Sequence, residues 1–162
     1  MCLFNKKIFI KIYMNILILY GTQTGNAKAM SEEIYANIID NNHPCSIHCF
    51  SEINDISSLI NYDFVIMLCS TTGNGDFPDD TQKFWKNIKN RKLDKTLYSK
   101  LNVSICGLGD SNYSMFCYSS KKLQKRIKEL GANEVIPLFL MDAVYDDEEQ
   151  LNEYLKLVFE FI

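Results

Sequence analysis

A loop of small and hydroxylated residues follows an apolar segment near the start of the 162-residue chain. Residues 16–20 are apolar, residues 21–25 read Gly-Thr-Gln-Thr-Gly, and apolar residues recur at helical spacing from Ala27 onwards. A strand, a small-residue loop and a helix start present backbone N–H groups and the positive end of a helix dipole to an anion. The loop lacks the lysine of a triphosphate-binding loop and the G-x-G-x-x-G of a dinucleotide site. It therefore predicts a site for a small phosphate monoester, with an ordinary tight turn as the alternative.

A second loop combines glycines with acidic residues after another apolar segment. Residues 70–80 read Ser-Thr-Thr-Gly-Asn-Gly-Asp-Phe-Pro-Asp-Asp. Gly73 and Gly75 permit a positive φ and a close backbone approach to a flat ligand. Asp79 or Asp80 is expected to cap the helix that follows.

The third loop, residues 107–117, places Tyr113 and Phe116 among small polar residues. At the mouth of a sheet, an aromatic ring in such surroundings is typical of a stacking platform. A loop tip that packs on itself is the alternative. Three such loops on one edge of a sheet favour a binding site over three unrelated turns.

Five apolar strands alternate with helices along the chain, and these elements must position the three loops. Strands are expected at residues 15–20, 45–50, 64–69, 102–107 and 135–140. Helices are expected at residues 26–40, 80–90, 118–130 and 147–161, with a weaker helical segment at 52–61. This alternation predicts an α/β fold with a doubly wound parallel sheet, in which ligands bind at the carboxyl ends of the strands.

The helix expected at residues 118–130 has an apolar and a basic face. Leu123, Ile127 and Leu130 are expected to face inward. The residues expected on the solvated face are Lys121, Lys122, Lys125, Arg126 and Lys128. A partner-binding patch is the alternative for this basic face.

Length and composition fit one globular domain. The formal net charge of −3 argues against a nucleic-acid binder, and no segment approaches the roughly 20 apolar residues of a membrane span. The six cysteines include no C-x-x-C pair, and Cys45, Cys69 and Cys106 are expected to act as small hydrophobic residues in strands. Because His48 lies on the opposite strand face from Cys45, no metal site is expected there. Reduced thiols fit a cytoplasmic location.

Residues 1–14 are mixed basic and apolar and merge into the first strand. They contain no small-residue cleavage site, so a signal peptide is not expected. We expect residues 1–14 to be an N-terminal extension, either disordered or derived from a mis-assigned start, and residues 15–162 to form the domain.

The three loops also carry a family resemblance. The motifs at residues 20–27, at 70–80 together with Phe84-Trp85, and at 107–116 closely resemble the flavodoxin-like FMN domain of diflavin reductases. The resemblance covers residues 15–162 and is greatest to the diflavin enzymes that serve cytosolic iron–sulfur protein assembly. It implies a flavodoxin-like, five-stranded parallel sheet of strand order 2-1-3-4-5 with helices on both faces. The cofactor that it implies is FMN.

The resemblance assigns the cofactor-binding residues one by one. The FMN phosphate would be bound by Thr22, Gln23, Thr24, Gly25, Asn26 and Ala27. One side of the isoalloxazine ring would be lined by Ser70, Thr71, Thr72 and Gly73. The opposite wall would be formed by Leu108, Gly109, Asp110, Ser111, Asn112, Tyr113, Ser114, Met115, Phe116 and Cys117, with the Tyr113 ring stacked on the flavin. After the fifth strand, an acidic contact would fall to Asp142.

A few positions depart from the family pattern. Thr72 stands where P450 reductase has a second stacking tyrosine, and Phe77, in place of a proline, would offer another ring to that face of the flavin. Cys117 replaces a common asparagine, and Ala143 replaces the second of two aspartates. The acidic contact of that second aspartate is therefore not carried over.

The resemblance implies an electron-transfer function without a catalytic residue in this domain. The domain would accept electrons from an FAD/NADPH reductase module, in the same or a separate chain, and pass them one at a time to a protein acceptor. Acidic residues concentrate in and near the loops, namely Asp76, Asp79, Asp80, Asp110, Asp142, Asp146, Asp147, Glu148 and Glu149. This acidic rim disfavours added negative charge on a bound flavin and attracts a basic-surfaced or iron–sulfur acceptor protein.

Other readings of the sequence remain open. The chain fits a free-standing flavodoxin served by a separate reductase, or the FMN domain of a P450-reductase or sulfite-reductase type enzyme. A non-redox doubly wound binding module is an alternative of another class. A receiver-like signalling domain would need an aspartate after the third strand, where Cys69 and Ser70 stand.

Overall fold

The computed structural model describes residues 13–162, so most of the expected N-terminal extension lies outside the described residues. Five strands form one sheet: β1 (Ile16–Gly21), β2 (Cys45–Cys49), β3 (Phe64–Ser70), β4 (Asn102–Gly109) and β5 (Asn133–Asp142). Their order is β2-β1-β3-β4-β5, and every neighbouring pair is parallel. The predicted five-stranded parallel sheet of order 2-1-3-4-5 is confirmed.

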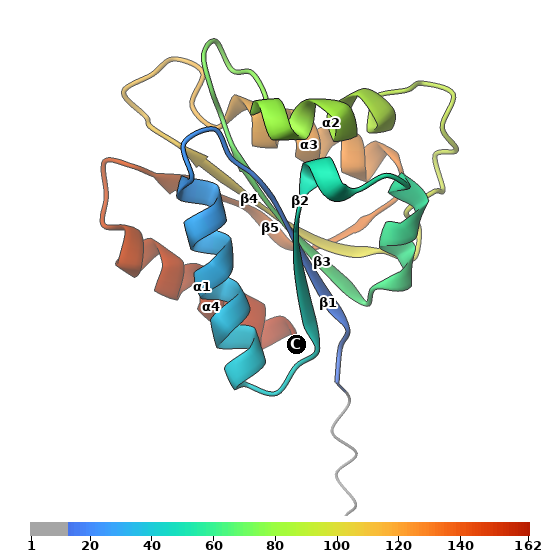
Figure 1. Cartoon of the computed structure of the whole chain (residues 1–162), viewed down its shortest axis with the longest axis horizontal. Helices are drawn as coiled ribbons and strands as arrows, with labels where there is room; N and C mark the ends of the chain where they lie inside the picture. Colours follow the sequence, from blue (N-terminus) through green and yellow to red (C-terminus); the bar gives the residue numbers. More distant parts are fainter. Residues whose placement is uncertain (1–12) are drawn as a thin grey trace, which may run out of the picture.

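Four α-helices cover the sheet: α1 (Asn26–Asp40), α2 (Gln82–Ile88), α3 (Tyr118–Glu129) and α4 (Asp147–Phe161). α1 and α4 pack on one face, whereas α2 and α3 pack on the other (Figure 1). None of the helices within residues 13–162 is long and apolar enough to cross a membrane.

Two predicted helices differ from the structure in length or type. The helix predicted at residues 80–90 starts as a 3₁₀ turn (Asp79–Thr81), continues as α2 and ends at Ile88. The segment predicted at 52–61 forms a 3₁₀ helix (Ile56–Asn61) after a shorter one (Phe50–Glu52). Both differences concern short 3₁₀ turns and helix ends, where helix boundaries vary by one or two residues.

Each face of the sheet has its own hydrophobic core, because successive strand side chains point to opposite faces. On β1, Leu17 and Leu19 pack in the core under α2 and α3, whereas Ile16 and Ile18 pack in the core under α1 and α4. The central strands β1 and β3 are buried along almost their whole length. Helices on both faces therefore explain why these strands have uninterrupted apolar sequences.

Strand cysteines contribute to these cores as small hydrophobic residues. Cys69 and Cys106 are fully buried, and Cys45 is half-buried. Burial raises the pKa of the Cys45 and Cys69 thiols to about 12 and raises the pKa of Cys106 as well. At neutral pH the three thiols are therefore uncharged, as expected for residues inside strands.

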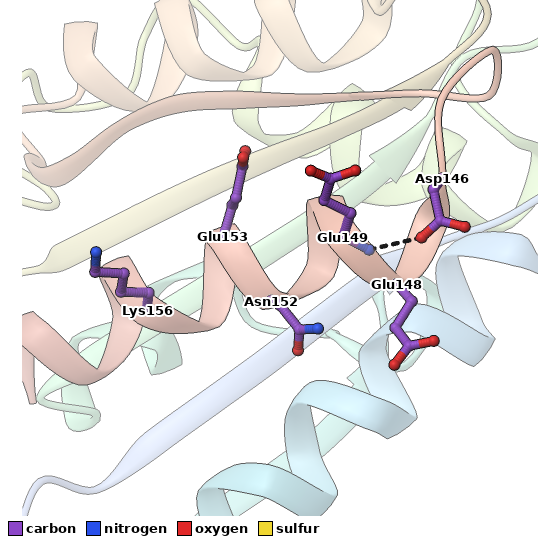
Figure 2. Close-up of a pocket in the computed structure, with 6 residues that line it drawn as sticks. All are labelled: Asp146, Glu148, Glu149, Asn152, Glu153 and Lys156. Atoms are coloured by element: carbon purple, nitrogen blue, oxygen red, sulfur yellow. Dashed lines mark hydrogen bonds between the residues drawn. The ribbon is translucent and has the colours of Figure 1, made fainter.

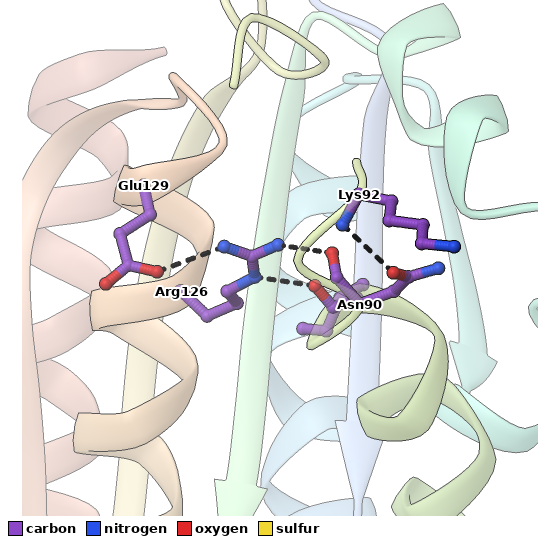
Figure 3. A network of polar contacts seen from close by, with 5 residues as sticks. Asn90, Lys92, Arg126 and Glu129 are labelled. Atoms are coloured by element: carbon purple, nitrogen blue, oxygen red, sulfur yellow. Dashed lines mark hydrogen bonds and ion pairs between the residues drawn. The ribbon is translucent and has the colours of Figure 1, made fainter. Parts of the chain in front are cut away.

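Arg126 of α3 fastens the end of α2 (Figure 3). Its Nε donates to the carbonyl oxygen of Ile88 at 2.6 Å, and its Nη2 donates to that of Asn90 at 2.8 Å. Its Nη1 pairs with Glu129 at 3.0 Å, and 14% of the side chain is exposed. The prediction of a solvated side chain is therefore wrong for Arg126. The last carbonyl groups of a helix lack hydrogen-bond donors within the helix. Arg126 donates to two carbonyl groups at and just after the end of α2.

Replacing Arg126 with methionine should lower the free energy of unfolding by about 1–3 kcal/mol, because two carbonyl oxygens lose a charged donor. Lys125→Met is the matched control, since Lys125 is exposed on the same helix. Urea unfolding followed by circular dichroism measures both variants. Equal stability of the two variants would contradict this role for Arg126.

The buried thiols should make the fold sensitive to alkaline pH. An unfolded thiol titrates near pH 8.5, whereas the folded pKa of Cys69 is about 12. The unfolded state thus loses its proton first, so the stabilisation is complete below about pH 8.5 and decreases as the pH rises above it. We expect the free energy of unfolding to fall by about 1.4 kcal/mol per pH unit for each such thiol. Denaturant unfolding between about pH 7.5 and 10.5 measures this slope, which should become shallower by the share of one thiol in a Cys69→Ala variant, because Cys45 and Cys106 remain.

Candidate functional site

The loop after β1 is fastened by the segment that precedes α2. The N–H of Thr22 donates to both carboxylate oxygens of Asp80, at 3.1 and 3.0 Å. Gln23 and Asp79 exchange two hydrogen bonds, of which the one from the Asp79 N–H to Gln23 Oε1 measures 3.1 Å. Asp79 and Asp80 therefore hold this loop, and the prediction that one of them caps α2 is wrong.

Gly21 marks the point of closest approach between these two segments. A methyl group at Gly21 would lie 2.0 Å from Oγ1 of Thr81 and 3.1 Å from the Phe50 ring. Thr81 in turn donates to Asp80 at 2.9 Å. The absence of a side chain at residue 21 thus lets the carboxylate of Asp80 reach the loop.

The N-terminus of α1 is left without a side-chain cap. Its N-cap is Gly25, with φ of 102° and no side-chain cap, and its first turn contains no acidic residue. The N-terminus of α4 differs, because Asp146 caps it and three acidic residues occupy its first turn. The first N–H groups of a helix have no partner within it, so α1 rather than α4 offers donors and a positive dipole end to an anion.

The loop after β3 is a closed turn anchored on α3. Thr72 and Asp76 exchange backbone hydrogen bonds of 3.0 and 2.8 Å around two positive-φ glycines, Gly73 and Gly75. The hydroxyls of Thr71 and Ser119 lie 2.7 Å apart, and Ser119 lies at the start of α3. The turn is therefore fixed at its base, while Gly73 stays exposed at its tip.

The loop after β4 is held by the end of β5. The carboxylate of Asp142 accepts the N–H of Ser111 at 3.0 Å, and the N–H of Ala143 donates to the carbonyl oxygen of Gly109 at 2.8 Å. Burial raises the pKa of Asp142, but the hydrogen bonds from Ser111 and Val144 outweigh it and hold the pKa below its usual value. Asp142 therefore positions the loop as a carboxylate, and Tyr113 at the tip of this loop is 70% exposed.

The three loops open onto one pocket of about 1010 Å³ at the carboxyl ends of the strands. The candidate residues that line it are Thr24, Asn26, Ser70, Thr71, Gly73, Leu108, Gly109, Asp110, Tyr113, Ser114, Met115 and Cys117. The candidate residues that do not line it are Thr22, Gln23, Gly25, Ala27, Thr72, Ser111, Asn112, Phe116 and Asp142. Several of the second group instead fix the backbone of the loops that line it.

The pocket extends further than the sequence analysis anticipated. It continues between α1 and α4, where the additional lining residues are Ala29, Met30, Glu33, Asn37, Asp147, Glu148, Leu151, Asn152 and Leu155. Asn74, Met141 and Ala143 complete the lining beside the loops. On α1, the spacing of Asn26, Met30, Glu33 and Asn37 is a helical stripe that starts at the predicted phosphate loop. This stripe is the sequence pattern that could have identified α1 as one side of the pocket.

The pocket is acidic. Its lining includes the carboxylates of Glu33, Asp110, Asp147 and Glu148, and no lysine or arginine of residues 13–162 lines it. A second, shallow pocket of about 520 Å³ lies along α4 and adds Asp146, Glu149 and Glu153 to the acidic surface (Figure 2). Negative charge therefore surrounds the N-terminal end of α4.

Two lysines of α3 approach the loops from the other side. Lys121 Nζ donates to the carbonyl oxygen of Phe116 at 2.9 Å. Lys122 Nζ lies 5.0 Å from the ring centroids of both Phe77 and Tyr118. Phe77 is 3% exposed and does not line the pocket, so the expectation that it covers a flavin face is wrong.

The comparisons with known proteins agree with this geometry. The sequence model of the flavodoxin family matches residues 18–156. NADPH-dependent diflavin oxidoreductase 1 of Xenopus laevis is 36% identical over 85% of this chain and 22% of its own length. Methionine synthase reductase of Mus musculus is 40% identical over 72% of this chain and 17% of its own length. The chain thus spans about a fifth of the length of these relatives.

A solved structure shows the same fold. Oxidised flavodoxin 1 from Bacillus cereus superposes with a TM-score of 0.77 and 21% identity, over 91% of this chain and 99% of that chain. The superposition spans nearly all of that flavodoxin, so this chain contains a whole unit of the fold.

Gly21→Ala should destabilise the protein by about 1–3 kcal/mol, because the new methyl group clashes with the Thr81 hydroxyl. In a Thr81→Ala background the hydroxyl is gone, and the same substitution should cost at least about 1 kcal/mol less. A double-mutant cycle by urea unfolding measures this coupling. Additive effects of the two substitutions would show that the two segments do not depend on each other.

Proposed function

We propose that this chain, which belongs to the flavodoxin family, binds FMN in the pocket at the carboxyl ends of its strands and carries electrons. Members of this family bind FMN. One observation carries the proposal: the loops after β1, β3 and β4 line a single pocket that also contains the uncapped start of α1.

The start of α1 fits the phosphate group of FMN. Thr24 and Asn26 line the pocket beside helix N–H groups that no side chain caps. Helix donors and hydroxyl groups stabilise a phosphate dianion without a lysine or arginine. FMN rather than unphosphorylated riboflavin is therefore the expected ligand.

The loops after β3 and β4 fit the isoalloxazine ring. Gly73 and Gly109 line the pocket without side chains, and Tyr113 offers an exposed aromatic ring to a flat ligand. Because the Tyr113 ring is exposed and does not pack in a core, it can stack on a flavin without loss of protein packing. Asp142 supports this side by holding the backbone of Ser111.

The acidic lining sets the electrostatic conditions for electron transfer. Bound FMN supplies a ring that takes up two electrons and releases them one at a time. Carboxylates of Asp110, Asp147 and Glu148 in the pocket lining disfavour further negative charge nearby. These residues thereby favour release of an electron to an acceptor.

The relatives suggest the partners. Diflavin oxidoreductase 1 is named as NADPH-dependent, and the chain matches only about a fifth of it. An FAD/NADP-binding reductase module, in the same or a separate polypeptide, would therefore supply the electrons. The acidic surface favours an acceptor protein with a basic face, and an iron–sulfur protein in the cytoplasm is the acceptor that we propose.

Titration of the purified chain with FMN and with riboflavin tests the proposal. FMN should bind at least tenfold more tightly, because only FMN carries the group that the start of α1 stabilises. Quenching of flavin fluorescence measures both affinities. A chain that binds neither flavin, or binds both equally, would contradict the proposed FMN site.

Tyr113→Ala should weaken FMN binding by about 1–3 kcal/mol if the ring stacks on the flavin, as base–aromatic stacking does. Tyr145→Ala is the matched control, because Tyr145 is 69% exposed and does not line the pocket. The same fluorescence titration compares them. Equal affinity of the two variants would assign the stacking to another residue.

A further inference from the structure

A groove between α1 and α4 continues the pocket away from the loops. We define this α1–α4 groove by Met30, Glu33 and Asn37 of α1 and by Glu148, Leu151, Asn152 and Leu155 of α4. From Asn26 to Asn37, α1 extends about 16 Å at 1.5 Å per residue. α1 runs antiparallel to the strands, so the groove leads along one face of the sheet and away from the carboxyl edge (Figure 1).

The floor of the groove is apolar. Leu155 is 7% exposed, whereas Met30 and Leu151 are half-buried. All three belong to or pack against the core under α1 and α4. A ligand that covers Met30 and Leu151 would remove apolar surface from water, which is favourable.

The walls of the groove present hydrogen-bond acceptors and negative charge. Within residues 13–162, neither Glu33 nor Glu148 takes part in an ion pair. The Asn37 Nδ2 donates to the carbonyl oxygen of Glu33 at 2.9 Å, which leaves its Oδ1 as an acceptor. Figure 2 shows Glu148 and Asn152 pointing from α4 towards α1, whereas Glu149 and Glu153 point away from it.

We propose that the α1–α4 groove is a second binding site, for a small amphipathic amine. The apolar body of such a ligand covers Met30 and Leu151, and its protonated nitrogen lies near the carboxylates of Glu33 and Glu148. An anion is repelled by the two carboxylates, and a neutral ligand leaves them without a counter-charge. This site shares one pocket with the proposed FMN site, but its residues lie on α1 and α4 rather than on the loops, so it can be tested with or without FMN.

The test is a calorimetric titration of the full chain with 1-naphthylmethylamine, and with the uncharged 1-naphthalenemethanol, at saturating FMN. The amine should bind about threefold to tenfold more tightly than the alcohol, since each exposed ion pair contributes modestly. Leu151→Ser should weaken both probes alike, because it removes apolar surface that the shared ring covers. Equal affinity for the two probes, or binding of neither, overturns the proposal.

Charge-matched variants locate the site. In the double variant Glu33→Gln, Glu148→Gln the amine and the alcohol should bind with about equal affinity, because both counter-charges are lost. The control Glu149→Gln, Glu153→Gln also removes two carboxylates, and it should keep the preference because both side chains point away from the groove. Loss of preference in both double variants would indicate a general charge effect and overturn the proposal.

Competition separates this site from the FMN site. The amine should still bind when FMN is bound, whereas displacement by FMN would place it at the loops and overturn the proposal. If the chain self-associates at high protein concentration and the amine then no longer binds, the groove is an interface with a second copy of the chain. That result would also overturn the proposal. If the chain binds no FMN, the titration without FMN and the two double variants still test the groove.

Discussion

The contact between Asp80 and the Thr22 N–H is the interaction on which the candidate site depends. The parallel sheet brings the loops after β1 and β3 to one edge, but strand order alone does not fix their backbones. Asp80 accepts the Thr22 N–H with both oxygens, and this is possible because Gly21 has no side chain against Thr81. The loop that starts α1 and the segment that starts α2 therefore have one shared conformation. Asp142 has the same role for the loop after β4.

Much of the fold could be predicted because the hydrophobic pattern of the strands was strong. β1 and β3 are buried on both faces, so their sequences are apolar throughout and their bounds agree with prediction to within one residue. Glycine and hydroxyl residues then identified the loops that line the pocket. The errors lie where a long-range contact decides a side chain's role. Asp80 could cap α2 or reach the first loop, and Arg126 could face water or the end of α2. Local sequence does not distinguish these choices.

The distribution of charge is less simple than the loop sequences suggested. Acidic residues do line the pocket, but Asp79 and Asp80 are not among them, because both form hydrogen bonds with the loop after β1. Lys121 and Lys122 approach the loops from α3, because that helix begins directly after the third loop. The negative field is therefore concentrated on the side of α1 and α4. A charged partner would meet two sides of this rim that differ in electrostatic character.

The uncapped start of α1 also has a consequence for folding. Because no side chain satisfies the first N–H groups of this helix, water must do so when no anion is bound. The first turn of α1 is then the least protected part of that helix against local opening. An anion that binds there stabilises the folded state by mass action. The ligand would thus act as a late structural component of the domain, and the supply of cofactor in the cell would govern how long the newly made protein survives proteolysis.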